Sequence, residues 1–316
     1  MENTLSCLFK AASIHNSIKK ELLDSDFISS DTSLINICDF IENRIRKRSH
    51  VSEYNNGIAF PTGVSLNNTV AHWTPLTKYD KTILCPNDVL KIDYGVHVNG
   101  CIIDSAFTIN LNPLYNPLLE ASKEAVTTII KECGVDSSAS ELGALSEEVI
   151  SSYEIDINGT MIPIKPINNV CGHNIRPWNI HGGKLFPGSS NTDTNTRIQE
   201  QDILAIEVFT STGNGVSYLS GQSSHFMLND SVHIDPNYKK FYKIIYGMFK
   251  TLPFCQRFID YNDESLRPYQ EKINEGIRKG YIKSYPPLIE PDKNARVAQF
   301  EHTIYVSETK KIQFTE

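Results

Sequence analysis

Two aspartates lie in a segment whose pattern brings carboxylates together. Residues 89–109 form two β-prone runs around Asn99-Gly100, the dipeptide favoured in a two-residue type I′ hairpin turn. Pairing outward from this turn places Asp104 opposite Gly95, with Asp93 as its diagonal neighbour on the same face, roughly 7–8 Å away. Like charges held so closely are unfavourable without a cation between them. A pair of surface aspartates is the alternative that the hairpin alone leaves open.

Two glutamates and a histidine stand in other strand-like segments. Glu207 lies inside the apolar run 203–209, and Glu301 lies in the β-prone run 298–305. A buried carboxylate without a partner either stays protonated or requires a metal ion or a cationic group beside it. Glutamates on edge strands are common, so each of these two also has a structural explanation. His173 follows another strand-like run and can supply an imidazole.

Together, four carboxylates and one imidazole suit two divalent ions with bridging oxygen ligands. Four negative charges balance two divalent cations, which leaves a neutral site that can bind a hydroxide. A water that bridges two metal ions ionises near neutral pH and becomes a nucleophile beside a Lewis acid. The residue types therefore predict hydrolysis of a carbonyl or phosphoryl ester or amide.

The N-terminal elements that would support such a site are helical. Apolar residues three to four positions apart between residues 5 and 22 predict an amphipathic helix. A second helix is predicted through Ile35 to Ile45, with Asp31 or Ser33 as its N-cap. Its basic end, residues 44–48, has the composition of a nucleic-acid patch. Cations also suit the C-terminus of a helix macrodipole, and we interpret the run as a solvated helix end.

Strand and helix signals alternate along the remainder of the chain. Strands are predicted within residues 58–108 and 163–209 and as a last pair over 298–306 and 311–314. Helices are predicted over 117–131, 139–153, 238–250 and 268–279. No internal repeat and no low-complexity linker divides the chain. The sequence therefore predicts a single compact α+β unit.

Composition excludes several classes of protein. The chain has 316 residues, of which 40% are apolar and 21% charged, as in globular proteins. Its net charge of −7 makes nucleic acid an unexpected main partner. No run approaches a transmembrane helix, and the N-terminus lacks the apolar core of a signal peptide. Seven cysteines without close pairs predict neither a disulfide framework nor a Cys-based zinc site. We therefore expect a cytoplasmic enzyme.

Five segments resemble, in order, the motifs of type 2 methionine aminopeptidases. They are FPTGVSLNNTVAHWTP, KIDYGVHVNGCIIDSAFT, VCGHNIRPWNIHGGK, AIEVFTSTGNG and AQFEHTI. The resemblance implies the pita-bread fold, a pseudo-symmetric α+β architecture, in one catalytic domain over residues 1–316. Two N-terminal helices would fill residues 1–50, and a helical insertion over residues 225–285 would distinguish type 2 from type 1. The chain resembles compact eukaryotic members without a basic N-terminal extension.

The resemblance also implies an activity and a metal site. The family removes the initiator methionine from nascent proteins whose second residue is small. Its five ligand positions are occupied here by Asp93, Asp104, His173, Glu207 and Glu301. By analogy, Asp104 and Glu301 bridge two divalent ions, His173 and Glu207 complete one of them, and Asp93 chelates the other. Cobalt, manganese, iron and zinc all tolerate such a site.

Three further histidines match family positions on the substrate side. His72 corresponds to a histidine that assists the leaving amine and that spiro-epoxides of the fumagillin type alkylate. His181 corresponds to one that polarises the substrate carbonyl, and His225 to one that lines the pocket. The other histidines stand in polar surroundings or beside a turn and are expected at the surface, namely His15, His50, His97 and His233. His302 alternates to the face opposite Glu301 and is interpreted as structural.

The methionine side chain is expected in an aromatic slot. Phe60, Phe209 and Tyr285 match positions around the family's apolar pocket, and a thioether packs well against aromatic rings. The expected substrates are N-terminal peptides of nascent proteins, with a contact to the ribosome. The protein is expected to be a monomer that contacts neither a membrane nor nucleic acid directly.

Two alternatives remain open. Another metallopeptidase of the same fold, directed at proline, would share the metal ligands, although the segments AFPTG and SLNN favour the methionine enzyme. A non-catalytic pita-bread protein that binds RNA or the ribosome would lose ligands and gain basic patches. Here all five ligand positions are kept and the net charge is −7, which disfavours that alternative.

Overall fold

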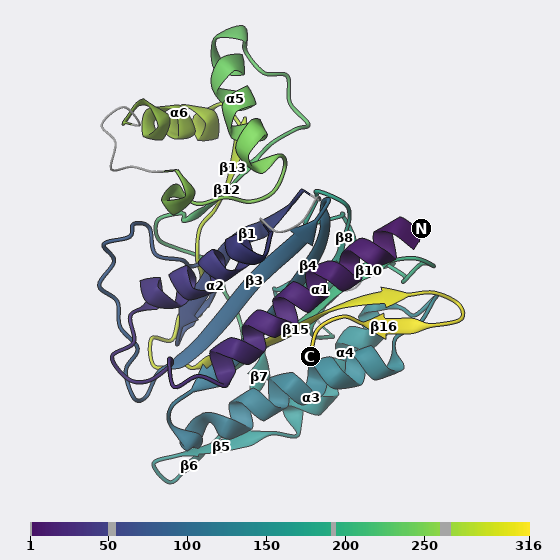
Figure 1. The fold of residues 1–316 in the computed structure, drawn as a ribbon. Coiled ribbons are helices and arrows are strands. Elements are labelled where there is room, and N and C mark those ends of the chain that lie inside the picture. The colour runs from purple at the N-terminus through teal and green to yellow at the C-terminus, as the bar shows by residue number, and fades with distance from the viewer. Residues whose placement is uncertain (1, 50–54, 191–193, 260–266) are drawn as a thin grey trace.

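The computed structural model describes residues 2–49, 55–190, 194–259 and 267–316 (Figure 1). One antiparallel sheet has the order β1 (Asn56–Leu66), β3 (Val89–Val98) and β4 (Cys101–Asn110). The turn between β3 and β4 has φ of 51° at Asn99 and 81° at Gly100, the positive values that a type I′ turn requires. The register pairs Gly95 with Asp104, so the predicted hairpin is confirmed.

A second sheet carries the remaining candidate ligands. Its order is β16 (Lys311–Gln313), β15 (Val297–Val306), β10 (Ile203–Ser211), β8 (Cys171–Ile175) and β9 (Leu185–Pro187), with β7 (Lys165–Pro166) also paired to β10. Hydrogen bonds between β4 and β15 join it to the first sheet. Ser105 Oγ donates to the carbonyl oxygen of Glu301 at 2.7 Å, and the backbone N–H of Asp104 donates to Thr303 Oγ1 at 2.8 Å. The two sheets therefore meet where Asp104 and Glu301 lie.

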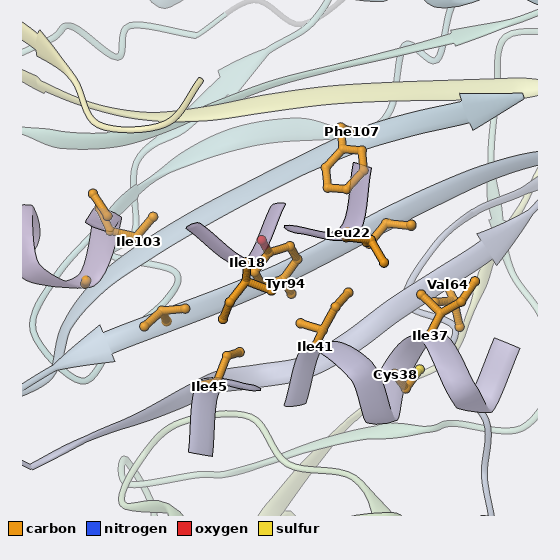
Figure 2. Close-up of a cluster of buried hydrophobic side chains, with 14 of the residues drawn as sticks. Ile18, Leu22, Ile37, Cys38, Ile41, Ile45, Val64, Tyr94, Ile103 and Phe107 are labelled. Atoms are coloured by element: carbon orange, nitrogen blue, oxygen red, sulfur yellow. The ribbon is translucent and has the colours of Figure 1, made fainter. Parts of the chain in front are cut away.

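Each sheet is covered by a pair of helices (Figure 1). α1 (Glu2–Leu23) and α2 (Leu34–Ser49) pack on the first sheet, while α3 (Asn116–Glu132) and α4 (Ala139–Ser151) pack on the second. Figure 2 shows the first interface, where Ile18 and Leu22 of α1 and Ile41 of α2 surround Tyr94. The repeated pairing of a sheet with two helices is the α+β arrangement that the sequence predicts.

Several short elements complete the fold. β2 (Thr69–Ala71) forms a small sheet with β14 (Leu288–Ile289) and β11 (Tyr218–Leu219). A hairpin of β5 (Glu154–Ile157) and β6 (Thr160–Pro163) follows α4, and a 3₁₀ turn, η1 (Pro113–Tyr115), precedes α3. No described helix is long and apolar enough to span a bilayer. All seven cysteines are free thiols.

The segment after β11 projects from one end of the molecule (Figure 1). It contains β12 (His225–Leu228), α5 (Pro236–Phe249), a 3₁₀ turn η2 (Gln256–Phe258), α6 (Arg267–Arg278) and β13 (Ile282–Tyr285). β12 and β13 pair with one another, so the expectation of helix across all of residues 225–285 is wrong at both ends. These strands close the insertion, and their pairing places His225 opposite Tyr285 beside the cavity described below.

Two of the histidines expected at the surface are buried. His15 is fully buried, and its ring stacks on Tyr94 at 4.1 Å between centroids. His97 is 5% exposed and lies 4.9 Å from the Trp178 ring. Both predictions are wrong because aromatic rings distant in sequence cover the two imidazoles. His15 was expected at the surface from its polar surroundings, and His97 from its place beside the turn. His233 is exposed as expected, and His50 lies outside the described residues.

Candidate metal centre

The five predicted ligand residues line one cavity of about 390 Å³. Each comes from a different strand, which explains how residues far apart in sequence converge. The strands and their residues are β3 with Asp93, β4 with Asp104, β8 with His173, β10 with Glu207 and β15 with Glu301. Glu207 and Glu301 are directly opposite one another in the β10–β15 register, and His173 pairs with Ala205, two residues before Glu207.

Three of these side chains form a compact group with the geometry of a metal site. The ligand atoms of Asp104, His173 and Glu301 all lie within 4.8 Å of one another, and His173 Nε2 is 3.6 Å from Asp104 Oδ2. Within the described chain, Asp93 Oδ1 and His173 Nδ1 are buried without a hydrogen-bond partner. Carboxylate oxygens and an imidazole nitrogen this close together fit a divalent cation, and buried polar atoms without a partner nearby accord with one.

The electrostatics of the metal-free site favour the same conclusion. Burial, followed by repulsion from neighbouring carboxylates, raises the pKa of Asp104, Glu207 and Glu301 well above the ordinary values. Burial likewise raises the pKa of Asp93 to about 7. No described lysine or arginine forms an ion pair with any of the four carboxylates. A divalent cation would relieve this repulsion.

The imidazole is in the form that binds metal. Burial lowers the pKa of His173 to about 3, with a smaller contribution from His181. His173 is therefore neutral at pH 7, and its lone pair is available for coordination. The residues present thus fit divalent metal ions both in donor type and in charge.

The raised carboxylate pKa values predict how pH acts on the metal-free protein. Because the pKa of Asp93 is about 7 when folded and 3.8 without burial, the native state holds this proton more tightly than the unfolded state. Its contribution to stability is present at acidic pH and is lost as pH rises toward 7. In chelator-treated protein, Tm should therefore fall more between pH 5 and 7.5 in the unmutated chain than in Asp93→Asn.

The test depends on the difference in Tm between the unmutated chain and Asp93→Asn at each pH. Buried histidines such as His15, whose pKa is lowered to about 3, titrate in the opposite sense and change the absolute Tm. Thermal denaturation of both proteins across the pH range separates the two effects. Parallel Tm curves for the two proteins would contradict the account of Asp93.

The histidines expected on the substrate side lie around the same cavity. His72 follows β2, and its ring centroid is 5.9 Å from Tyr285 and 6.2 Å from His225. His181 lies in the loop between β8 and β9, 4.5 Å from the His173 ring. Burial lowers the pKa of His72 to about 4 and also lowers that of His181. Both imidazoles are therefore neutral at pH 7 and can donate one hydrogen bond.

The aromatic residues expected to bind methionine belong to the apolar part of the cavity wall. Phe60, Phe209 and Tyr285 all line it. Phe60 pairs with Gly95 across β1 and β3, and a Cβ at Gly95 would lie only 2.3 Å from the Phe60 ring. Glycine at this position therefore provides the space that the Phe60 ring occupies.

One further polar residue of the site, Gln299, was not predicted from the sequence. Gln299 is 1% exposed, lines the cavity, and donates from Nε2 to Glu207 Oε2 at 3.3 Å. It also contributes a hydrogen bond that lowers the pKa of Asp93, against the larger effect of burial. Gln299 stands two residues before Glu301 on β15, so strand alternation alone could have identified it as facing the same side. His302, on the opposite face, bonds Thr315 Oγ1 at 2.9 Å.

Comparisons of the sequence relate this chain to known metallopeptidases. A family model described as metallopeptidase family M24 matches residues 6–308. Methionine aminopeptidase 2 of Kluyveromyces lactis is 42% identical over 313 residues, covering 96% of this chain and 73% of that protein. The Saccharomyces cerevisiae protein of the same name is 42% identical over 317 residues, with the same coverage.

Solved structures show the same fold. A thermophilic Arx1 has a TM-score of 0.83 at 20% identity and covers 100% of this chain and 91% of its own. A methionine aminopeptidase from Thermotoga maritima has a TM-score of 0.66 at 14% identity, covering 100% and 98%. Prolidase from Pyrococcus furiosus has a TM-score of 0.57 at 13% identity, covering 100% and 64%. At these identities the likeness concerns the fold alone.

Proposed function

This chain belongs to metallopeptidase family M24, and on that basis we propose that it is a metal-dependent aminopeptidase that removes N-terminal methionine. Its fold is the pita-bread fold expected from the sequence. The observation that carries the proposal is the convergence of four carboxylates and His173 on one cavity that also holds neutral histidines and aromatic rings. Relatives 42% identical over almost the whole chain are named methionine aminopeptidase 2.

The metal ligands in this proposal are Asp93, Asp104, His173, Glu207 and Glu301. Asp104, His173 and Glu301 form the compact group and would hold the ions together with Asp93 and Glu207, which line the same cavity. Cobalt, manganese, iron or zinc would each suit these donors. When bound, such ions supply Lewis acidity and lower the pKa of a bound water toward neutrality.

The neutral histidines have separate roles in the proposed reaction. His72 lines the cavity beside Tyr285 and is not in the compact ligand group. It would donate a proton to the scissile amide nitrogen as this becomes the leaving amine. His181, beside His173, would donate a hydrogen bond to the substrate carbonyl oxygen, where negative charge develops.

The methionine side chain would lie in the apolar half of the cavity. Phe60 and Phe209 offer ring faces to a thioether, and Tyr285 and His225 close the side toward the insertion. The proposed substrates are nascent proteins that begin with methionine. We propose that the enzyme acts on them in the cytoplasm, near the ribosome and as a monomer. Seven free thiols accord with a reducing compartment.

Hydrolysis of the tripeptide Met-Ala-Ser in the presence of Mn²⁺ or Co²⁺ tests the proposal. We expect release of free methionine. An Ala-Pro dipeptide serves as the matched substrate for a proline-directed enzyme of the same fold and should not be hydrolysed. Cleavage of Ala-Pro but not Met-Ala-Ser would assign the chain to that alternative, and cleavage of neither would leave only a binding function.

Substrate choice should follow the size of the second residue. The hydrolysed bond lies between methionine and this residue, beside the metal centre and His72, where a bulky side chain would displace the carbonyl from its position of attack. Peptides beginning Met-Gly, Met-Ala, Met-Thr and Met-Val should be cleaved, whereas Met-Lys and Met-Phe peptides should not. Comparing kcat/KM across this series measures the effect, and equal values would contradict the initiator-methionine assignment.

A further inference from the structure

The backbone around His72 is held in a strained conformation. His72 has φ of 61°, in the left-handed region that residues with a Cβ rarely adopt. Its Nδ1 atom is buried and has no hydrogen-bond partner in the part of the chain that the structure describes. The position of the imidazole therefore depends on how the backbone of residues 72–75, which we call the His72 segment, is fixed. Such a conformation persists only when its surroundings hold it.

Ser224, at the entry to the insertion, binds the backbone directly after the strained residue. Its hydroxyl donates to the carbonyl oxygen of His72 at 3.2 Å and accepts from the backbone N–H of Thr74 at 3.3 Å. It also lies 3.0 Å from Nδ1 of His225. Ser224 is only 1% exposed, so water does not compete for these bonds. One hydroxyl thus connects the backbone on either side of Trp73 with a histidine of the cavity wall.

Arg257, within the insertion, holds the other end of the segment. Its Nε donates to the carbonyl oxygen of Pro75 at 2.8 Å, and Nη2 donates to Thr74 Oγ1 at 2.7 Å. The remaining bonds go to both carboxylate oxygens of Glu42 on α2, each at 2.9 Å. Both charged side chains are almost completely buried, at 5% and 1% exposure. A bidentate pair of this kind fixes the plane of the guanidinium.

We propose that Ser224 and Arg257 are positioning residues that hold His72 in place in the cavity that the metal ligands line. These two side chains do not contact the reacting atoms. They support the reaction only by fixing the His72 segment. This inference rests on the proposed function, because it requires His72 to act on the substrate. It predicts an effect on kcat with little effect on KM, since a displaced imidazole loses a contact made as the leaving amine forms.

Ser224→Ala tests the proposal on the full-length protein loaded with Mn²⁺. We expect kcat for Met-Ala-Ser to fall roughly 10- to 100-fold, because a small displacement of a catalytic group lowers the rate by this order. KM, bound metal per chain and Tm should stay near those of the unmutated protein. Thr74→Val is a second variant that keeps Ser224 and the Glu42–Arg257 pair. It removes the bond from Arg257 to Thr74 Oγ1 and a longer contact of this hydroxyl with Cys38 Sγ at 3.7 Å. It should lower kcat in the same direction by less.

Thr210→Val is the matched control. Thr210 is fully buried on β10, and its hydroxyl donates to the carbonyl oxygen of Leu118 at 2.9 Å, away from the His72 segment. This variant also loses a buried hydroxyl bonded to a backbone carbonyl, and it should keep kcat unchanged. A second readout, which does not depend on turnover, is the rate at which a fumagillin-type spiro-epoxide labels His72, measured by mass spectrometry. This rate should fall in Ser224→Ala and stay unchanged in Thr210→Val.

The outcomes separate this inference from the proposed function. If the unmutated protein does not cleave Met-Ala-Ser, the proposed function fails. If the unmutated protein is active, the inference alone is overturned by an unchanged kcat in Ser224→Ala, by a rise in KM without a fall in kcat, or by loss of metal. An equal loss of kcat in Thr210→Val would also overturn it, because the effect would then be general.

Discussion

Asp104→Asn and Glu301→Gln should each abolish hydrolysis of Met-Ala-Ser. A neutral amide cannot bridge two cations as a carboxylate can, and these two residues belong to the compact ligand group. Removing a residue that only orients a metal ligand typically lowers metal affinity or activity 10- to 100-fold. Removing the ligand itself should therefore lower activity by more than about 10²-fold. Rates should be measured together with bound metal per chain.

The same substitutions should leave the protein folded. Each replaces a buried carboxylate, whose pKa is raised by burial and by its neighbours, with a neutral group of the same shape. Without metal, Tm should therefore be no lower than in the unmutated protein. Glu308→Gln, on the exposed turn after β15, is the control and should change neither rate nor metal content. Full activity in Asp104→Asn would end the hypothesis of a carboxylate-bridged centre.

His72→Ala should lower kcat by roughly 10²–10⁴-fold, the range for a positioned general acid or base. The imidazole is neutral because burial lowers its pKa to about 4, and it lines the cavity without belonging to the compact ligand group. Metal content should therefore stay near that of the unmutated protein. Stopped assays with Met-Ala-Ser and elemental analysis of the same preparations measure both quantities.

Covalent labelling tests the role of His72 independently of kcat. We propose that a fumagillin-type spiro-epoxide alkylates His72, because its imidazole faces the cavity outside the compact ligand group. Mass spectrometry should find one adduct per chain, on His72. An adduct on His181 or His225 instead, or loss of metal in His72→Ala, would overturn the role given to His72.

Local chemistry explains why the metal-bearing hairpin could be predicted. The Asn99-Gly100 turn fixes the register of β3 and β4, and register determines which side chains share a face. Glu207 and Glu301 stood out because a carboxylate inside an apolar strand needs an explanation. The sequence alone, however, did not show that these two strands pair with the glutamates directly opposite one another.

Features that depend on contacts between distant segments were not predictable. His15 was expected at the surface because its neighbours in sequence are polar, yet α1 places it against Tyr94. The ends of the insertion were expected to be helical, yet β12 and β13 pair with one another. The buried pair of Glu42 and Arg257 joins residues that no local pattern connects. In each case tertiary packing decides the environment of a side chain.

The central claim is that the five converging residues hold the metal ions on which peptide hydrolysis depends. Titration of chelator-treated protein with Mn²⁺, followed by isothermal calorimetry and by Met-Ala-Ser hydrolysis on the same samples, tests it most directly. The account predicts two ions bound per chain, with activity absent before addition and restored as they bind. Binding of less than one ion, or full hydrolysis in the chelator-treated protein, would contradict it.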